Sequence, residues 1–270
     1  MLQSYNKIFY SANLDIHFDH INNHKKKVLA AISSICCLNI IKTLFSADFI
    51  HPCNSTSREC LIKATQDAIP GFVKGFPQFN IQHLDPFTID ELPIPLAGLK
   101  ARFYKGQASG FRNCIVDDVI SQLDKRIFVL EFHCNLTIKG LYEANGQFLL
   151  FPINGGGNAK IKLTNLSMRV TINTKYITDE NGFHYFGVKN YKYTFDYGDK
   201  ITFDIQNIIR ESKELSNTVL AFINENWRTL AEEFGKPIVD YSVDLAIRTI
   251  GKFFRAVPFE ELIYVPFPGN

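Results

Sequence analysis

The sequence lacks the cysteine spacings that mark metal or redox chemistry. Its six cysteines form no C-x-x-C motif, which argues against a thioredoxin-like redox site. None of its seven histidines is paired with a cysteine at the spacing of a zinc site. Tryptophan and methionine are also scarce, with one and two copies, whereas phenylalanine occurs 24 times. The composition therefore points to a large aromatic core and not to a metal centre.

The chain also lacks an apolar run of comfortable membrane-spanning length. The run at residues 28–41 has 14 residues, whereas a span needs about 20. It follows the lysines at 25–27 and is closed by Lys42, with small residues at 46 and 47. This order is typical of a secretory signal segment, and a buried core helix is the alternative. We therefore expect residues 1–47 to be an N-terminal extension with a signal segment and residues 48–270 to be a single secreted, extracellular domain.

Neither sign of charge is in excess once that segment is removed. Residues 1–47 hold five lysines and two aspartates, so 24 basic and 25 acidic side chains remain. A near-neutral chain argues against a nucleic-acid partner, which would require a basic patch or stripe.

Catalytic motifs are absent as well. "NGGGN" at 154–158 lacks the following helix with Lys-Ser/Thr that a phosphate-binding loop needs, so a hairpin turn is the better interpretation. "GQASG" at 106–110 has its serine one place away from that of a nucleophile elbow. Asp117–Asp118 are expected to be solvated near a turn, and His133 and His184 have no acidic neighbours at useful spacing. We therefore expect no catalytic residue, no metal and no cofactor, and no enzymatic activity.

After removal of the signal segment, four cysteines remain, and they allow three pairings: Cys53, Cys60, Cys114 and Cys134. An even number in an oxidising compartment predicts disulfides. From Ile127 to Ile138 apolar and polar residues alternate, which indicates a half-buried strand. A preceding strand at 111–119, with a turn centred near residue 124, places Cys114 opposite Cys134. The geometry of this hairpin favours a disulfide between them.

Three glycosylation sequons provide a separate indication of secretion. They begin at Asn54, Asn135 and Asn165. Asn135 is expected on the polar face of its strand, as a glycan requires.

The periodicity of the remaining chain predicts an α+β protein. A capping box predicts a helix from Thr56 that ends at the "IPG" of 69–71. Residues 86–203 have the period of strands, with parity changes near Asn165 and Asn190 that indicate β-bulges. Helical spacing follows at 215–234 and 239–254, separated by "GKP" at 235–237. This order favours a long, strongly curved antiparallel sheet with helices lying in or against it.

Five segments, taken in order, resemble one known family. They are the C-x6-C pair at 53 and 60, "LDPFTIDELPI" (84–94), "LTIKGLYEANGQFLLFPINGGGNAKIKL" (136–163), "FINENW" (222–227) and "VPFEELI" (257–263). Together they resemble the takeout and juvenile hormone binding protein family of insects, over about residues 50–265. The resemblance implies a secreted carrier whose sheet wraps around a long C-terminal helix. It also implies a Cys53–Cys60 disulfide near an N-terminal helix that gates a ligand channel, and it connects the chain with circadian rhythm.

These expectations lead to a functional hypothesis. We expect a monomeric, non-catalytic carrier of a small hydrophobic molecule, such as a terpenoid hormone or fatty acid, without stable membrane insertion. The alternative is a secreted protein that acts on a membrane surface or a receptor. Tyr142 and the tyrosines of "NYKYTFDY" (190–197) are candidate hydrogen-bond donors to the ligand. The residues expected to line the channel are Leu61, Ala64, Phe72, Phe103, Phe128, Leu130, Phe132, Leu136, Ile138, Tyr142, Met168, Val170, Phe222 and Trp227.

Overall fold

A computed structural model describes residues 49–96 and 98–268 of the 270-residue chain. The chain divides into two units, Met1–Ser46 and Ala47–Asn270, and every described residue lies in the second. The predicted signal segment therefore lies outside the described residues, and its role stays a prediction.

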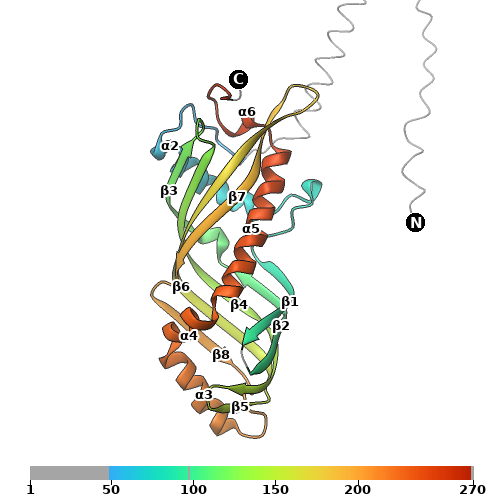
Figure 1. Ribbon diagram of the computed structural model, residues 1–270, viewed down its shortest axis with the longest axis vertical. Coiled ribbons are helices and arrows are strands. Elements are labelled where there is room, and N and C mark those ends of the chain that lie inside the picture. Colours follow the sequence, from blue (N-terminus) through green and yellow to red (C-terminus); the bar gives the residue numbers. More distant parts are fainter. Residues whose placement is uncertain (1–48, 97, 269–270) are drawn as a thin grey trace, which may run out of the picture. The chain divides into compact units, whose positions relative to one another are not determined.

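One antiparallel sheet contains all the named strands of the described residues (Figure 1). Its main path runs β1-β2-β4-β6-β7, with β3 and β5 paired to β4 and β8 paired to β6. The strands are β1 (Phe87–Leu96), β2 (Leu99–Ser109), β3 (Ile115–Gln122), β4 (Ile127–Phe148), β5 (Phe151–Ile153), β6 (Gly156–Thr178), β7 (His184–Asp196) and β8 (Lys200–Ile205). The longest two, β4 and β6, carry the period-2 alternation that the sequence shows.

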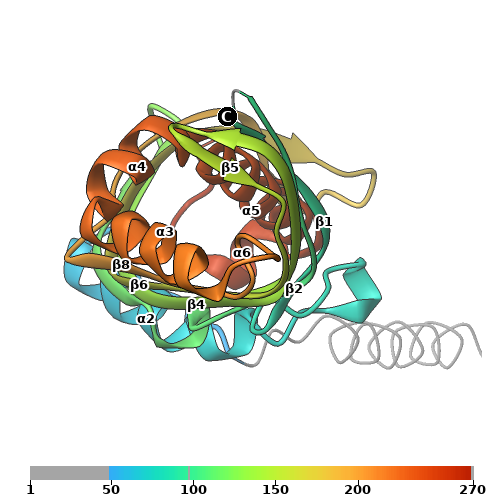
Figure 2. The same ribbon diagram turned by 90° about the horizontal axis from the view of Figure 1, so that it is seen from below.

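Helices precede and follow the sheet. At the C-terminal end, α3 and α4 pack on β8, and α5 packs on β7 (Figures 1 and 2). The helical elements are α2 (Arg58–Phe72), η1 (Pro77–Phe79), η2 (Phe111–Asn113), α3 (Lys213–Glu225), α4 (Trp227–Phe234), α5 (Lys236–Ala256) and α6 (Phe259–Leu262). The fold is therefore α+β, with a long antiparallel sheet packed against C-terminal helices.

Register shifts occur at both predicted bulges. The β4–β6 register shifts where Asn165 lies opposite Asn135, and Asn165 has a φ of 59°. The β6–β7 register shifts between Asn173 and Thr174, where Lys189 is the extra residue of β7. An extra residue on one strand restores the inward direction of the apolar side chains after the shift.

The predicted hairpin turn at "NGGGN" is wrong. The chain reverses at Leu149–Leu150, between β4 and β5. β5 and β6 then both pair with β4 in one continuous register, so the glycines lie in the extended segment that joins β5 to β6 and begins β6. They are needed for close approach: a Cβ on Gly155 would lie 2.6 Å from the carbonyl oxygen of Ile208. The glycines thus let residues 207–210 pass close to the backbone of this extended segment. The local sequence does not reveal this contact.

Two helix boundaries also differ from the sequence prediction. Helix α2 begins at Arg58 and not at Thr56, and its N-cap Ser57 makes no side-chain capping bond. It continues through Pro70 to Phe72, so "IPG" does not end it. The predicted helix at 215–234 is two helices that meet at Asn226. The "GKP" segment is the direct junction of α4 and α5, with the proline in the first turn of α5, where its missing N–H costs nothing.

Candidate ligand-binding site

An apolar cluster lies between the sheet and α5. Its fully buried members are Val170 and Ile172 from β6 and Val243 and Ile247 from α5. Large side chains packed against them are only partly buried, and these include Phe128, Phe132 and Met168. The structure thus brings together four of the residues predicted to line a channel: Phe128, Phe132, Met168 and Val170.

The other predicted lining residues lie in different packed clusters. Phe103, Ile138 and Tyr142 share a cluster with Val219 of α3. Leu61 and Ala64 pack beside Cys53, and Phe72 packs with Phe253. Leu136 lies at the second disulfide, and Trp227 packs against Tyr197. The ring of Phe222 lies 5.7 Å from that of Phe151, and Leu130 is partly buried in β4. Their ligand-binding role stays a prediction.

Three of the candidate donor tyrosines already have protein partners. The hydroxyl of Tyr142 donates to the Gln206 carbonyl oxygen at 2.7 Å, and burial raises the pKa of Tyr142 to about 12. Tyr191 donates to Asp244 at 3.1 Å, and Tyr193 donates to Asp240. Burial is the main cause that raises the pKa of Tyr193 to about 12. Each of these hydroxyls thus donates its proton within the protein and joins the sheet to Gln206 or to α5, and a role of these tyrosines in ligand binding stays a prediction.

Both predicted disulfides are present. Cys53 pairs with Cys60 at a Cα–Cα distance of 5.9 Å, and Cys114 pairs with Cys134 at 4.5 Å. The β3–β4 register places Ile115 opposite His133, so the two cysteines face each other as the symmetric hairpin predicts.

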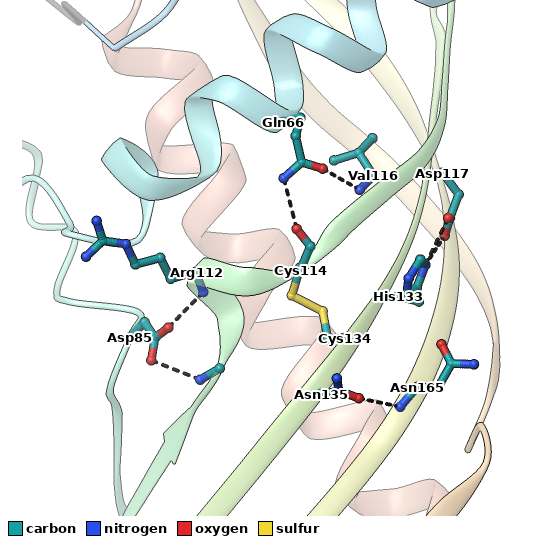
Figure 3. The surroundings of a disulfide bond; sticks show 11 residues. Gln66, Asp85, Arg112, Cys114, Val116, Asp117, His133, Cys134, Asn135 and Asn165 are labelled. Carbon is teal, nitrogen blue, oxygen red and sulfur yellow. Dashed lines mark hydrogen bonds and ion pairs between the residues drawn. A yellow bond between two sulfur atoms is a disulfide. The ribbon is translucent and has the colours of Figure 1, made fainter.

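Polar contacts beside the second disulfide hold α2 on β3 (Figure 3). The side chain of Gln66 donates to the Cys114 carbonyl oxygen at 3.0 Å and accepts the Val116 N–H at 2.8 Å. At the start of α2, eight residues before Gln66, Arg58 reaches Asp118 with two guanidinium nitrogens, each 2.7 Å from a carboxylate oxygen. The N-terminal half of α2 is thus tied to β3 by directional contacts.

The expectation that Asp118 is solvated is wrong. It is 7% exposed, because a β-bulge between Val116 and Asp118 turns its side chain toward α2. The two strand histidines also have acidic partners, which arrive from other elements. His133 Nδ1 lies 2.9 Å from a carboxylate oxygen of Asp117, and Figure 3 marks this pair by a dashed line. His184 Nδ1 lies 2.6 Å from Glu260 of α6.

The sequon asparagines are all exposed. Asn135 and Asn165 are neighbours at the β4–β6 bulge, where the Asn135 side-chain oxygen accepts the Asn165 N–H at 2.8 Å (Figure 3). Asn54 lies beside the first disulfide. Glycosylation of the three remains a prediction.

Residues of the resembling segments have structural tasks that sequence alone does not show. Asp85 accepts the backbone N–H groups of Gly110 and Arg112 and so closes the turn before β3 (Figure 3). Asn224 clamps α3 to β8 by donating to the Phe203 carbonyl oxygen and accepting the Phe203 N–H, both at 2.8 Å. Gly140 leaves room for the ring of Phe103.

A polar surface cleft of about 420 Å³ lies over the paired residues 100–102 of β2 and 143–145 of β4. Its wall includes Lys100, Arg102 and Arg210. Arg102 contacts Glu143 at 2.8 Å, and this hydrogen bond is the main cause that lowers the pKa of Glu143. Over residues 49–96 and 98–268 no group of three or more His, Cys, Asp or Glu side chains is arranged to hold a metal ion. In the same part of the chain, no helix has the length and apolar character needed to span a bilayer.

The fold is shared with a solved protein. The crystal structure of takeout 1 from Epiphyas postvittana matches with a TM-score of 0.75 and 33% sequence identity, covering 80% of this chain and 100% of that one. Two sequence relatives are named circadian clock-controlled protein daywake. The one from Drosophila yakuba is 23% identical and the one from Drosophila melanogaster 21%, each over 77% of this chain and 85% of its own length.

These matches place the chain in a class, the takeout-like α+β proteins. A profile described as haemolymph juvenile hormone binding protein matches residues 28–264, and the chain belongs to this family. The family consists of non-catalytic carriers that bind hydrophobic ligands, so the resemblance and the expectation of a protein without enzymatic activity are confirmed.

We predict that Arg58→Ala destabilises the protein more than Asp118→Asn does. Loss of Arg58 leaves a buried carboxylate without its partner, at a cost of about 1–3 kcal/mol, whereas loss of the Asp118 charge leaves Arg58 in contact with water. Urea unfolding measures the stability, and hydrogen exchange of residues 61–72 reports on α2. Lys63→Ala, which removes an exposed pair with Asp67, is the control. A change for Arg58→Ala no larger than for this control would contradict the anchoring role.

Proposed function

We propose that the protein is a secreted carrier that holds a small hydrophobic ligand between its sheet and α5. The observation that carries this proposal is the partial burial of Phe128, Phe132 and Met168, which face α5 beside fully buried aliphatic residues. A core that is packed to the usual density leaves little accessible surface on side chains of this size. Apolar surface that remains accessible beside a helix suits a lipophilic ligand.

The proposal includes a curved sheet and a gating helix. Bulges bend and twist a sheet, and the shifts at Asn165 and Lys189 lie on the strands that face α5. Because Arg58 and Gln66 tie the first half of α2 to β3, gating would belong to its C-terminal end. There Phe72 lies edge-on to Phe253 of α5, with ring centroids 5.3 Å apart.

Binding energy sets the kind of ligand. Burying about 400 Å² of lipophile surface gains roughly 10 kcal/mol at about 25 cal/mol per Å². Association costs of about 4–15 kcal/mol offset much of that gain. A terpenoid hormone or a fatty acid derivative is large enough for a net gain, and a polar contact would add affinity.

Secretion is part of the proposal. The lysine-flanked run at 28–41, two disulfides and three exposed sequons agree with an oxidising, extracellular compartment. The family's description as a haemolymph protein agrees with this location.

A second candidate function, contact with a membrane surface, is favoured by the β4–β5 turn. Leu150 is 88% exposed and Leu149 is 49% exposed with a φ of 53°, a conformation that is costly for leucine. The wall of the polar cleft carries Lys100 and Arg210, but it also carries the carboxylates of Glu211 and of Glu143, which pairs with Arg102, so this candidate function rests on the exposed leucines. In that function the turn would enter the bilayer surface while the carrier takes up or releases its ligand.

We predict that Val170→Phe reduces lipophile binding at least several-fold, because the added ring occupies space beside Phe128 and Met168. Protein purified from its native fluid should also yield a stoichiometric lipophile on solvent extraction, identified by mass spectrometry. Thr194→Phe, on an exposed position of β7, is the matched control. An extract without lipophile, together with unchanged probe binding by Val170→Phe, would rule the carrier proposal out.

The membrane candidate makes a separate prediction. The double variant Leu149→Ser, Leu150→Ser should lose flotation with phosphatidylcholine vesicles and keep its affinity for the lipophile. Phe183→Ser, which changes a 44% exposed aromatic residue of the β6–β7 turn, should float as the unaltered protein does. Equal flotation of both variants would argue against a role of the β4–β5 turn.

A further inference from the structure

The hydroxyl of Tyr197 is a buried polar group without a partner. Tyr197 is 6% exposed, and within residues 49–96 and 98–268 its oxygen is the one buried side-chain polar atom that makes no hydrogen bond. A buried hydroxyl without a partner costs free energy that phenylalanine in the same place would not. Folding alone therefore does not account for tyrosine at this position.

The side chains packed around the ring of Tyr197 are apolar. Its ring belongs to a cluster with Ile201 and Ala231, against which Leu163, Trp227 and Val239 pack. The hydroxyl lies at the α4–α5 junction, where a Cβ on Gly235 would stand 2.2 Å from the oxygen. Glycine at this junction thus makes room for a hydroxyl that the protein itself does not use.

The other tyrosines considered as ligand donors differ from Tyr197. The hydroxyls of Tyr142, Tyr191 and Tyr193 each have a protein acceptor. Among these four, only the Tyr197 proton remains available.

Charge near Tyr197 selects the kind of acceptor. Burial raises the pKa of Tyr197, and the carboxylates of Glu232 and Asp240 raise it further. The hydroxyl therefore stays protonated at neutral pH and is a donor. Glu232 and Asp240 pair with Arg228 and Lys236, so the penalty for an anionic ligand group at Tyr197 comes mainly from the apolar side chains around the ring.

We infer that the Tyr197 hydroxyl donates a hydrogen bond to an uncharged oxygen of the lipophile, such as that of an ester, an ether or a ketone. The inference rests on the proposed carrier function and adds a specificity-determining residue to it. It orders the ligands by chemistry: a neutral ester binds more tightly than a hydrocarbon of the same length, and a carboxylate gains nothing from this site.

The test compares Tyr197→Phe with the unaltered chain, using methyl oleate, oleate and the hydrocarbon 8-heptadecene as competitors of a fluorescent lipophilic probe. Tyr197→Phe should weaken methyl oleate binding by about 3- to 10-fold, the size of one net hydrogen bond. Its affinity for the hydrocarbon should not change. Without ligand, its unfolding midpoint should be equal to or higher than that of the unaltered protein, because no internal hydrogen bond is lost.

Tyr176→Phe is the control, because the Tyr176 hydroxyl already donates to the Leu123 carbonyl oxygen. It should lower the unfolding midpoint and leave the ester-to-hydrocarbon ratio unchanged. If Tyr197→Phe keeps this ratio while both lipophiles still bind, the assignment of Tyr197 is overturned and the carrier function stands. If the unaltered protein binds none of the three lipophiles, the carrier function itself fails, and the role of Tyr197 fails with it.

Discussion

The pairing of β4 with β6 is the constraint on which the rest of the structure depends. The two strands pair along nearly their whole length, from Ile127 opposite Asn173 to Glu143 opposite Gly156. β2, β3 and β5 attach to β4, and β7 and β8 attach to β6. Because side-chain direction alternates along a strand, a slip of one residue would turn the apolar set away from α5. The bulge at Asn165 keeps that set facing inward on both sides of the shift.

Helices cover this sheet through side chains of two kinds. Apolar residues such as Val243 and Ile247 provide most of the buried area, and paired polar groups fix the position. Asn224 holds α3 to β8, and the tyrosine pairs with Asp240 and Asp244 hold α5 to β7. Since these polar groups use their hydrogen-bonding capacity within the protein, the interior offers a ligand mainly apolar surface.

The first described residues of the chain contact α5, although α5 lies near the other end of the sequence. The backbone of Cys53 pairs with that of Ile263 in an isolated parallel β-bridge. The rings of Phe49, Phe72 and Phe76 pack around Phe253. Directional contacts hold α2 from Arg58 to Gln66, whereas its last turn is held by apolar packing, of Ile69 beside the second disulfide and of Phe72 against Phe253. A ligand gate would therefore open at the aromatic contact and not at the disulfide.

Period and parity were sufficient to predict the strands, both bulges and the Cys114–Cys134 pairing, because these depend on alternation along one or two neighbouring segments. The turn predicted at "NGGGN" was wrong for a physical reason. Its glycines make room for residues 207–210, which lie about 50 positions away in the sequence. Asp118 and His184 were misjudged similarly, since their partners are 60 and 76 residues distant. Of the lining residues, the four around α5 come together because they lie on the same sheet face of the paired strands β4 and β6, whereas the others belong to clusters that only the tertiary structure defines.

The central claim is that a lipophile lies between the sheet and α5. Anomalous diffraction from crystals grown with a methyl ester of a brominated fatty acid would locate the ligand directly. The account predicts bromine density beside Phe128, Phe132 and Met168, with the ester oxygen within hydrogen-bond distance of the Tyr197 hydroxyl. Bromine density confined to the outer surface, for example in the cleft at Lys100 and Arg210, would contradict it.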